Sequence, residues 1–266
     1  MLNRALYRRE MKSSVRLLLI LAAILTLYVS VIIAMYDPAL MAMLDGFVRI
    51  MPQLMAAVGM SAGATSLLGF MVSYLYGFVL LIFPMLFCIL RGNGLIAKYV
   101  DDGSMVSLMA APVKRRSVAL TQAVVLVSGL LLLVAYTTLL EVICVAVSFP
   151  EELDVAGLLA LNGGLCCLQL FIGGICFLIS CAAPDARTSL GFGAGIPALM
   201  YVLHMLANLG GAAAKAKYFT VFTLFDPSGL LAGSGAALAG TLALLAGAIG
   251  LYALSVAIFC QRDLSI

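Results

Sequence analysis

The sequence predicts an all-α protein that crosses a membrane six times, and three observations lead to this prediction. The 266-residue chain is 64% hydrophobic and only 10% charged, whereas soluble domains carry about 25% charged residues. Its apolar residues form six runs, each long enough to cross the bilayer core as a helix. Almost all of its charges lie between these runs. We therefore expect residues 1–266 to form a single transmembrane domain.

The six runs define the expected spans. The third is the longest, so we expect it to tilt or to project beyond the bilayer. The first is too long for the core of a signal peptide and precedes no small-residue cleavage site, so we expect it to remain as a span. The runs are Leu17–Tyr36, Leu67–Leu90, Val118–Ser148, Val155–Ala183, Ser189–Leu209 and Ala236–Cys260.

The distribution of Lys and Arg predicts the orientation. An even number of spans places both termini on one side, and an excess of basic residues marks that side as cytoplasmic. Arg49, Lys215 and Lys217 are expected on the outer side. The short loops and the lack of a targeting segment favour the plasma (inner) membrane of a prokaryote. The other twelve of the 15 basic residues are Arg4, Arg8, Arg9, Lys12, Arg16, Arg91, Lys98, Lys114, Arg115, Arg116, Arg187 and Arg262.

Residues 1–16 are expected to form an amphipathic helix that lies in the cytoplasmic membrane interface. Arg4, Arg8 and Lys12 recur every four residues and therefore share one helical face, while Leu6 lies away from it. The alternative is a basic anchor that only fixes the topology.

The first outer segment is expected to form a short surface helix. Its apolar residues between positions 44 and 58 follow the helical period. Asp45 and Arg49 are spaced to pair on one face, and Pro52 interrupts or kinks the helix.

The last outer loop, residues 210–235, is too apolar for a solvated linker. We expect it to enter the outer leaflet as a pair of half-helices around a turn at "FDPSG", which begins at Phe225. Backbone at that depth must be shielded by protein, so the loop is expected to pack against span six or a partner subunit.

Few residues suit catalysis or metal binding. The seven cysteines form no C-x-x-C pair and are expected to be small apolar residues, so we predict no metal or cofactor bound by this chain. The single histidine, His204 in span five, could relay protons or contact substrate, but more often such a residue bonds a neighbouring helix. Glu141 lies in span three, about two turns from its outer end. It could line a substrate path, reach the outer interface, or bond Thr137 or Thr138.

One stretch matches a hydrolase motif. "GMSAG", Gly59–Gly63, fits the G-x-S-x-G pattern of a serine nucleophile, Ser61, but no base is near it in sequence. The same residues also fit G-x-x-x-G, as do Gly191–Gly195 and Gly229–Gly233. We favour the second interpretation, in which these glycines allow helices to approach closely.

A polar segment, residues 97–112, separates spans two and three and is expected to form a short amphipathic helix. Asp101 and Asp102 suit a helix N-terminus, with Asp102 as the N-cap, and Pro112 ends the helix. The alternative is a helix that only lies on the headgroups. Its expected apolar face consists of Met105, Leu108 and Met109.

The basic cluster that follows is expected to contact anionic headgroups and to fix the start of span three. With the N-terminal cations it forms the predicted membrane-interface set: Arg4, Arg8, Lys12, Lys114, Arg115 and Arg116.

Four stretches in this order resemble the membrane subunits of type-2 ATP-binding-cassette exporters. They are "LYRREMKSSVRLLLI", "KYVDDGSMVSLMAAPVKRRSVALTQ", "DARTSLGFGAGIPALMYVLHML" and "IFCQRDLSI". The resemblance implies a permease that pairs with an identical or homologous second permease and with two copies of a separate ATPase. ATP and Mg would bind the ATPase. Membrane lipids are the other expected partner, and no nucleic acid is expected.

The resemblance also assigns roles to residues. The helix in residues 97–112 would be the coupling helix that docks on the ATPase, through Asp101, Asp102, Met105, Leu108 and Met109. Spans two and five are rich in Gly, Pro and aromatic residues, so we expect them to form the path of an amphiphile such as a lipid, peptide or drug. The expected path residues are Tyr74, Phe78, Glu141, Tyr201 and His204.

Two other functions fit the sequence. One is an intramembrane enzyme that uses Ser61, Glu141 or His204. The other is a sensor or scaffold subunit that binds an amphiphile without moving it.

Overall fold

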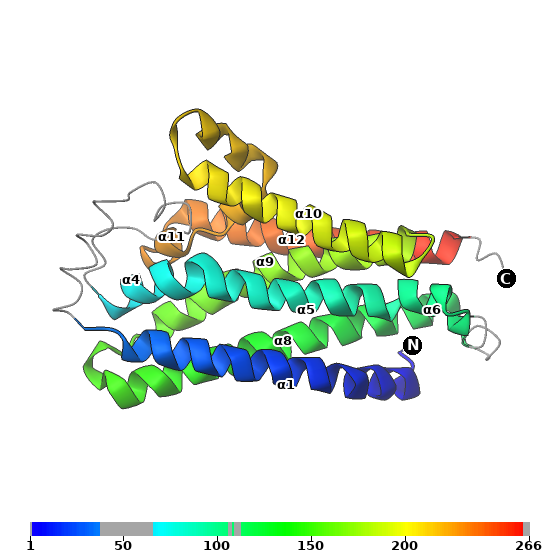
Figure 1. The fold of residues 1–266 in the computed structure, drawn as a ribbon, viewed down its shortest axis with the longest axis horizontal. Helices are drawn as coiled ribbons and strands as arrows, with labels where there is room; N and C mark the ends of the chain where they lie inside the picture. The colour runs from blue at the N-terminus through cyan, green and yellow to red at the C-terminus, as the bar shows by residue number, and fades with distance from the viewer. Residues whose placement is uncertain (1, 38–65, 106–107, 109–112, 263–266) are drawn as a thin grey trace.

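The structure, a computed structural model, describes residues 2–37, 66–105, 108 and 113–262. In this part of the chain it has no strand and six helices long and apolar enough to cross a membrane, which confirms the predicted class. The spans run side by side in an elongated bundle (Figure 1). The start of α1, the end of α12 and α6 lie at one end, which we call the basic end; α4 and α11 lie at the opposite end.

The second span is built from four consecutive segments, and short helices join spans three to four and five to six. The spans are α1 (Arg4–Ala34); α4 (Leu67–Met71), η1 (Val72–Val79), α5 (Leu80–Leu95) and α6 (Ala97–Asp101); α8 (Arg115–Ser148); α9 (Val155–Ala182); α10 (Ala186–Asn208); and α12 (Gly235–Gln261). The short helices are η2 (Pro150–Glu152), η3 (Gly211–Phe219), η4 (Val221–Leu224) and α11 (Pro227–Leu231).

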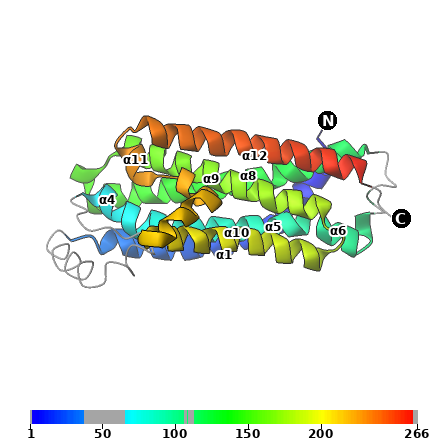
Figure 2. The ribbon, with the colours of Figure 1, turned by 90° about the horizontal axis from the view of Figure 1, so that it is seen from above.

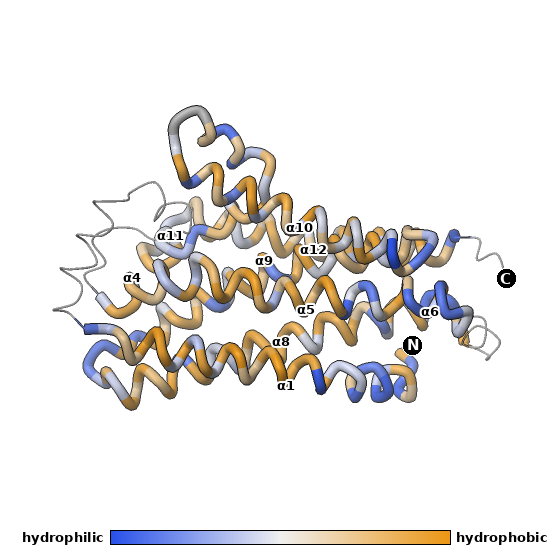
Figure 3. Tube along the Cα trace, viewed as in Figure 1, coloured by the Kyte–Doolittle hydropathy of each residue, from blue (hydrophilic) through white to orange (hydrophobic). Residues whose placement is uncertain are grey.

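Helix α1 differs from the expectation of a separate interfacial helix over residues 1–16. It is continuous from Asn3, whose side chain accepts hydrogen bonds from the Ala5 and Leu6 amides. The reason is that its buried stripe continues in register into the apolar run. The Asn3 amide also donates to Thr121 Oγ1 of α8 at 3.0 Å, so the first turn of α1 is tied to the bundle. Figure 3 shows that only this end of α1 is strongly hydrophilic. The stripe consists of Leu6, Glu10, Ser14, Leu21, Leu25, Val29 and Ile33.

The second span contains a π-helix that the sequence analysis did not anticipate. Segment η1 covers Val72–Val79 and runs directly into α5, which carries Pro84. A proline inside a helix removes a backbone hydrogen bond, and π-helical turns are rare and often lie at functional sites. This span is therefore the least regular of the six.

Helix α9 lies at the centre of the bundle, where it contacts α5, α8, α10 and α12. Figure 2 shows α12 running along α9. Of the glycines that the G-x-x-x-G pattern singled out, Gly229 lies close to α12, where a Cβ would be 3.0 Å from the Ala237 Cβ. Other close approaches use glycines outside the pattern; a Cβ at Gly129 or Gly173 would meet Phe87 or Tyr252. By contrast, a Cβ at Gly191 or Gly195 of α10 would meet no atom within 4 Å. The predicted close packing at Gly191–Gly195 is thus absent within the described chain.

The last outer loop is more helical than a half-helix pair around a turn. The "FDPSG" stretch begins α11: Asp226 is its N-cap, accepting from the Gly229 amide at 2.9 Å, and Pro227 holds the first position. Phe222, Phe225 and Leu230 are buried. Both η4 and α11 contact α9 and α12, so this part of the loop packs on the bundle. Segment η3 projects from it beside α10 (Figure 1).

Several predictions fall outside the described residues. They concern the outer helix with Asp45, Arg49 and Pro52, the "GMSAG" motif with Ser61, and two residues of the polar segment, Met109 and Pro112.

Candidate functional site

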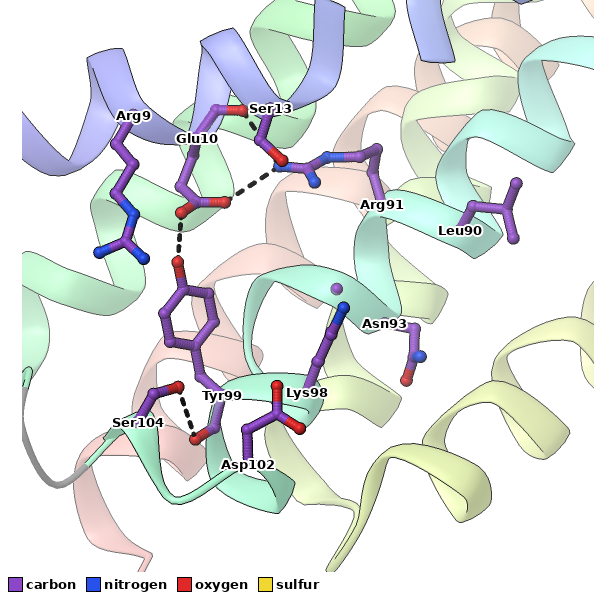
Figure 4. A pocket seen from close by; sticks show the side chains of 11 residues that line it. Arg9, Glu10, Ser13, Leu90, Arg91, Asn93, Lys98, Tyr99, Asp102 and Ser104 are labelled. Carbon is purple, nitrogen blue, oxygen red and sulfur yellow. Dashed lines mark hydrogen bonds and ion pairs between the residues drawn. The ribbon is translucent and has the colours of Figure 1, made fainter. Parts of the chain in front are cut away.

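The candidate site lies at the basic end, where three helices meet around a buried carboxylate. Glu10 belongs to the buried stripe of α1 and is 3% exposed. Arg91, near the end of α5, forms an ion pair with it, with Nη2 at 3.1 Å from Oε2. The Tyr99 hydroxyl of α6 donates to the other carboxylate oxygen. Figure 4 shows both partners reaching Glu10 from different helices.

Buried charges require this pairing. An unpaired buried carboxylate costs several kcal/mol, roughly, and a charge-assisted hydrogen bond offsets part of that cost. Arg91 Nη2 also donates to the Glu10 backbone oxygen at 3.2 Å, which holds the guanidinium against α1. The sequence analysis missed Glu10, although one signal was present: it is the only acid among the first 36 residues, in an otherwise basic segment.

A cavity of about 520 Å³ opens beside this cluster, between α1, α5 and α6. Its lining combines cationic, anionic and hydroxyl side chains. The charged and aromatic members are Arg9, Glu10, Arg91, Lys98, Tyr99 and Asp102.

The polar segment folds differently from the predicted helix. Asp102 caps the C-terminus of α6, donating its amide to the Lys98 carbonyl at 2.9 Å, so it is not an N-cap. Gly103 follows with φ +68°, a left-handed conformation that glycine adopts without strain. The chain becomes helical again at Ser104. A break at Gly103 therefore separates the two aspartates from the apolar residues.

The expected apolar docking face turns toward this chain instead. Met105 is 3% exposed and belongs to the core, and Leu108 packs partly buried against it. The physical reason is that an apolar helix face next to an incompletely covered bundle is stabilised by burial there. Asp101 and Asp102, in contrast, are exposed. The exposed side chains of the described segment are therefore charged rather than apolar: Lys98, Asp101 and Asp102.

The three basic residues at the start of α8, Lys114, Arg115 and Arg116, lie in two different environments. Arg115 Nη1 donates to the backbone oxygen of Arg262 at 2.9 Å, and Arg262 Nη1 donates to the Cys181 oxygen at 3.0 Å. Arg115 thus ties α8 to the end of α12, in place of the headgroup contact expected for it. Lys114 and Arg116 are exposed, as are Arg4, Arg8 and Lys12.

Glu141 belongs to a second buried cluster, about two turns from the opposite end. It is 0% exposed. Its Oε2 accepts from the Tyr76 hydroxyl of η1 at 2.9 Å and from Asn162 Nδ2 of α9 at 2.6 Å. The Thr137 and Thr138 hydroxyls bond backbone oxygens of their own helix instead. Glu141 therefore neither bonds a threonine of its own helix nor reaches the membrane interface, which were two of the expected alternatives. Its hydrogen bonds instead join three spans.

The other expected path residues do not gather around Glu141. Phe78 lies against Tyr201 with ring centroids 6.4 Å apart, and Tyr201 and His204 both face Phe222, at 5.5 and 5.8 Å. His204 Nε2 lies 3.4 Å from Asn208 of its own helix. Tyr74 packs against Phe70, with ring centroids 4.5 Å apart and the rings tilted by 37°. His204 and Glu141 thus belong to separate groups of side chains.

A third carboxylate lies at the opposite end, outside the spans. Glu152 of η2 accepts from the Leu67 amide at 3.0 Å and from the Tyr36 hydroxyl at 3.4 Å. Burial, and then the Glu152 carboxylate, raise the pKa of the Tyr36 phenol. These bonds join the end of α1 to the start of α4.

Comparison with known proteins gives no information on the function of this chain. No protein-family model, characterised protein or solved structure matches the chain.

Proposed function

We propose that this chain is the membrane-spanning subunit of an ATP-driven exporter of the type-2 ATP-binding-cassette class. It works with a second permease chain and two copies of a separate ATPase, and it exports an amphiphile. The proposal places the basic end in the cytoplasm of a prokaryote, because an excess of basic residues marks the cytoplasmic side of membrane proteins. ATP and Mg belong to the ATPase.

The observation that carries the proposal is the link from the polar segment to two spans. Tyr99 of α6 and Arg91 of α5 both hold Glu10 of α1. A force applied to α6 is therefore transmitted to α1 and α5 through buried, charge-assisted bonds. A coupling element that converts ATPase closure into movement of spans needs such a connection.

The surface that meets the ATPase is the acidic turn at the end of α6. Asp101, Asp102 and Gly103 are exposed. Because Met105 is buried in this chain, the apolar contact first expected there contributes to the fold of the permease. We expect the ATPase to present basic side chains to this turn.

The experiment is purification of the tagged full chain from its native membranes, followed by identification of bound proteins and measurement of ATP hydrolysis. We expect an ATPase to be retained with the wild type and lost from an Asp101→Lys, Asp102→Lys variant. The matched control is Glu151→Lys, an exposed acid at the opposite end, which should retain it. A wild-type chain that purifies without any ATPase, or a double variant that retains it fully, would contradict the proposal.

The amphiphile path is assigned to the face shared by spans two and five. Phe78 of η1 is partly exposed beside Tyr201 of α10, and the next segment of span two, α5, also contacts α10. Stimulation of ATP hydrolysis by a panel of amphiphiles should be lost in Tyr201→Ala. It should persist in Tyr218→Ala, which alters an exposed tyrosine of η3. Equal stimulation of both variants would remove this face from the path.

A further inference from the structure

We propose that the cavity at the basic end binds a phosphate group, carried either by a lipid headgroup or by a soluble phosphate ester. This inference does not depend on the exporter assignment. It rests on the charge of the lining, on the position of the cavity and on its size.

The lining has cationic groups that its own acids do not neutralise. Arg9, Arg91 and Lys98 face two carboxylates, Glu10 and Asp102. Glu10 is already paired with Arg91 and bonded by Tyr99. In the described part of the chain, neither Arg9 nor Lys98 forms an ion pair. An entering anion therefore meets two uncommitted cations and one free carboxylate.

Arg91 can contact a second anion while it remains paired with Glu10. Its hydrogen bonds to Glu10, both to the side chain and to the backbone, come from Nη2. Figure 4 shows its guanidinium and the Lys98 amine reaching toward the space between them. An arginine fork that is held by one carboxylate and presents its remaining donors is a common phosphate contact, and lysine adds a point charge.

The position of the cavity matches the level of lipid headgroups. The last apolar residue of α5 before Arg91 is Leu90, and the apolar run of α1 begins only at Leu17. Glu10 and Arg91 thus lie just beyond the apolar part of both spans. The volume of about 520 Å³ also falls in the range of small-ligand sites.

The experiment uses the purified full chain in a neutral detergent. Binding is read from the rise in unfolding temperature as short-chain phosphatidylglycerol, or inorganic phosphate at constant ionic strength, is added. We expect saturable stabilisation by at least one of them. If only the lipid saturates, the phosphate is a headgroup; if inorganic phosphate also saturates, the site accepts a soluble ester. Either result supports the proposal.

Variants test whether this cavity is the site. Arg9→Gln with Lys98→Gln should weaken binding about tenfold, whereas Asp102→Asn should strengthen it, since one removes attraction and the other repulsion. The matched control is Arg16→Gln with Arg187→Gln, which removes two exposed cations that do not line the cavity. Counting bound lipid by native mass spectrometry gives a second measurement that does not depend on unfolding.

The proposal is overturned by either of two results. One is the absence of saturable binding by both probes. The other is equal affinity of the wild type and the Arg9→Gln, Lys98→Gln variant.

Discussion

The Glu10 and Glu141 clusters each give a buried glutamate two side-chain donors, but Glu10 accepts one on each oxygen whereas Glu141 accepts both on Oε2. Each buried glutamate accepts a tyrosine hydroxyl from the second span, Tyr99 or Tyr76. The second donor differs: Glu10 has Arg91, which is charged, and Glu141 has Asn162, which is neutral. The first cluster borders a polar cavity, whereas the second lies inside the bundle.

This difference separates two ways of joining helices. The arginine provides charge-assisted bonds that tolerate an adjacent aqueous space, because the ion pair is neutral as a unit. The asparagine provides a neutral bond and also bonds the Tyr76 oxygen at 2.7 Å, which closes a triangle among three spans. We therefore expect substitutions that change charge to destabilise the Glu10 cluster most. In the Glu141 cluster, we expect substitutions that remove a fitting hydrogen-bond donor to matter most.

The largest expected effect is the loss of the cation at the basic end. Arg91→Met leaves Glu10 buried without a counter-charge and should lower the free energy of unfolding by about 3 kcal/mol. Thermal unfolding in detergent, followed with a thiol-reactive dye that reports the buried cysteines, measures this. Arg187→Met removes an exposed arginine and is the control. Equal unfolding temperatures for the two variants would show that the ion pair contributes little.

Removing the Asn162 amide from the Glu141 cluster should destabilise the protein less than removing the Arg91 cation. Asn162→Leu takes a hydrogen bond from Glu141 and should cost about 2 kcal/mol. In a Glu141→Leu background, the same substitution should cost much less, because the buried acceptor is gone. The double-mutant cycle in the same unfolding assay gives the coupling. Additive costs would mean that the bond does not stabilise the fold.

The Tyr36–Glu152 pair extends the comparison to a solvated carboxylate. The raised pKa of Tyr36 means that its contribution to stability is complete below the unfolded value of about 10 and is lost as pH rises through the folded pKa. Between pH 9 and 11.5, Tyr36→Phe should therefore lose less stability than the wild type. Tyr218→Phe, at an exposed tyrosine, should follow the wild type. Parallel curves for wild type and Tyr36→Phe would exclude this linkage.

The smallest effect is expected at a carboxylate with local partners only. Asp185 caps α10, and hydrogen bonds from the Thr188 amide, at 2.7 Å, and hydroxyl lower its pKa. Its contribution is present above the unfolded value of about 3.9 and is lost as pH falls through the folded pKa. The unfolding temperature of Asp185→Asn should consequently change less than that of the wild type between pH 5 and 3. A steeper change of the unfolding temperature in Asp185→Asn than in the wild type would contradict a stabilising role of the ionised Asp185 cap.

The sequence predicted the spans well and the contacts between them poorly. Six apolar runs identify six helices because the bilayer requires that length and composition. The partners of Glu141 could not be predicted, because Tyr76 and Asn162 approach it only when three spans pack. Met105 shows the same limit: its spacing with Leu108 predicts an apolar face, but the pattern is identical whether that face meets this bundle or another protein. The π-helix has no comparable signal in the residues of η1.

The continuity of α1 has a mechanical consequence. A helix of 31 residues is about 46 Å long, which exceeds the bilayer core of about 30 Å. Its basic end is held at Glu10, and no break separates that point from Ala34. A tilt of about 5° around Glu10 would displace the far end by about 3 Å, since about 36 Å of rigid rod lies between them. A small rotation imposed on one membrane surface would thus become a sliding movement at the other.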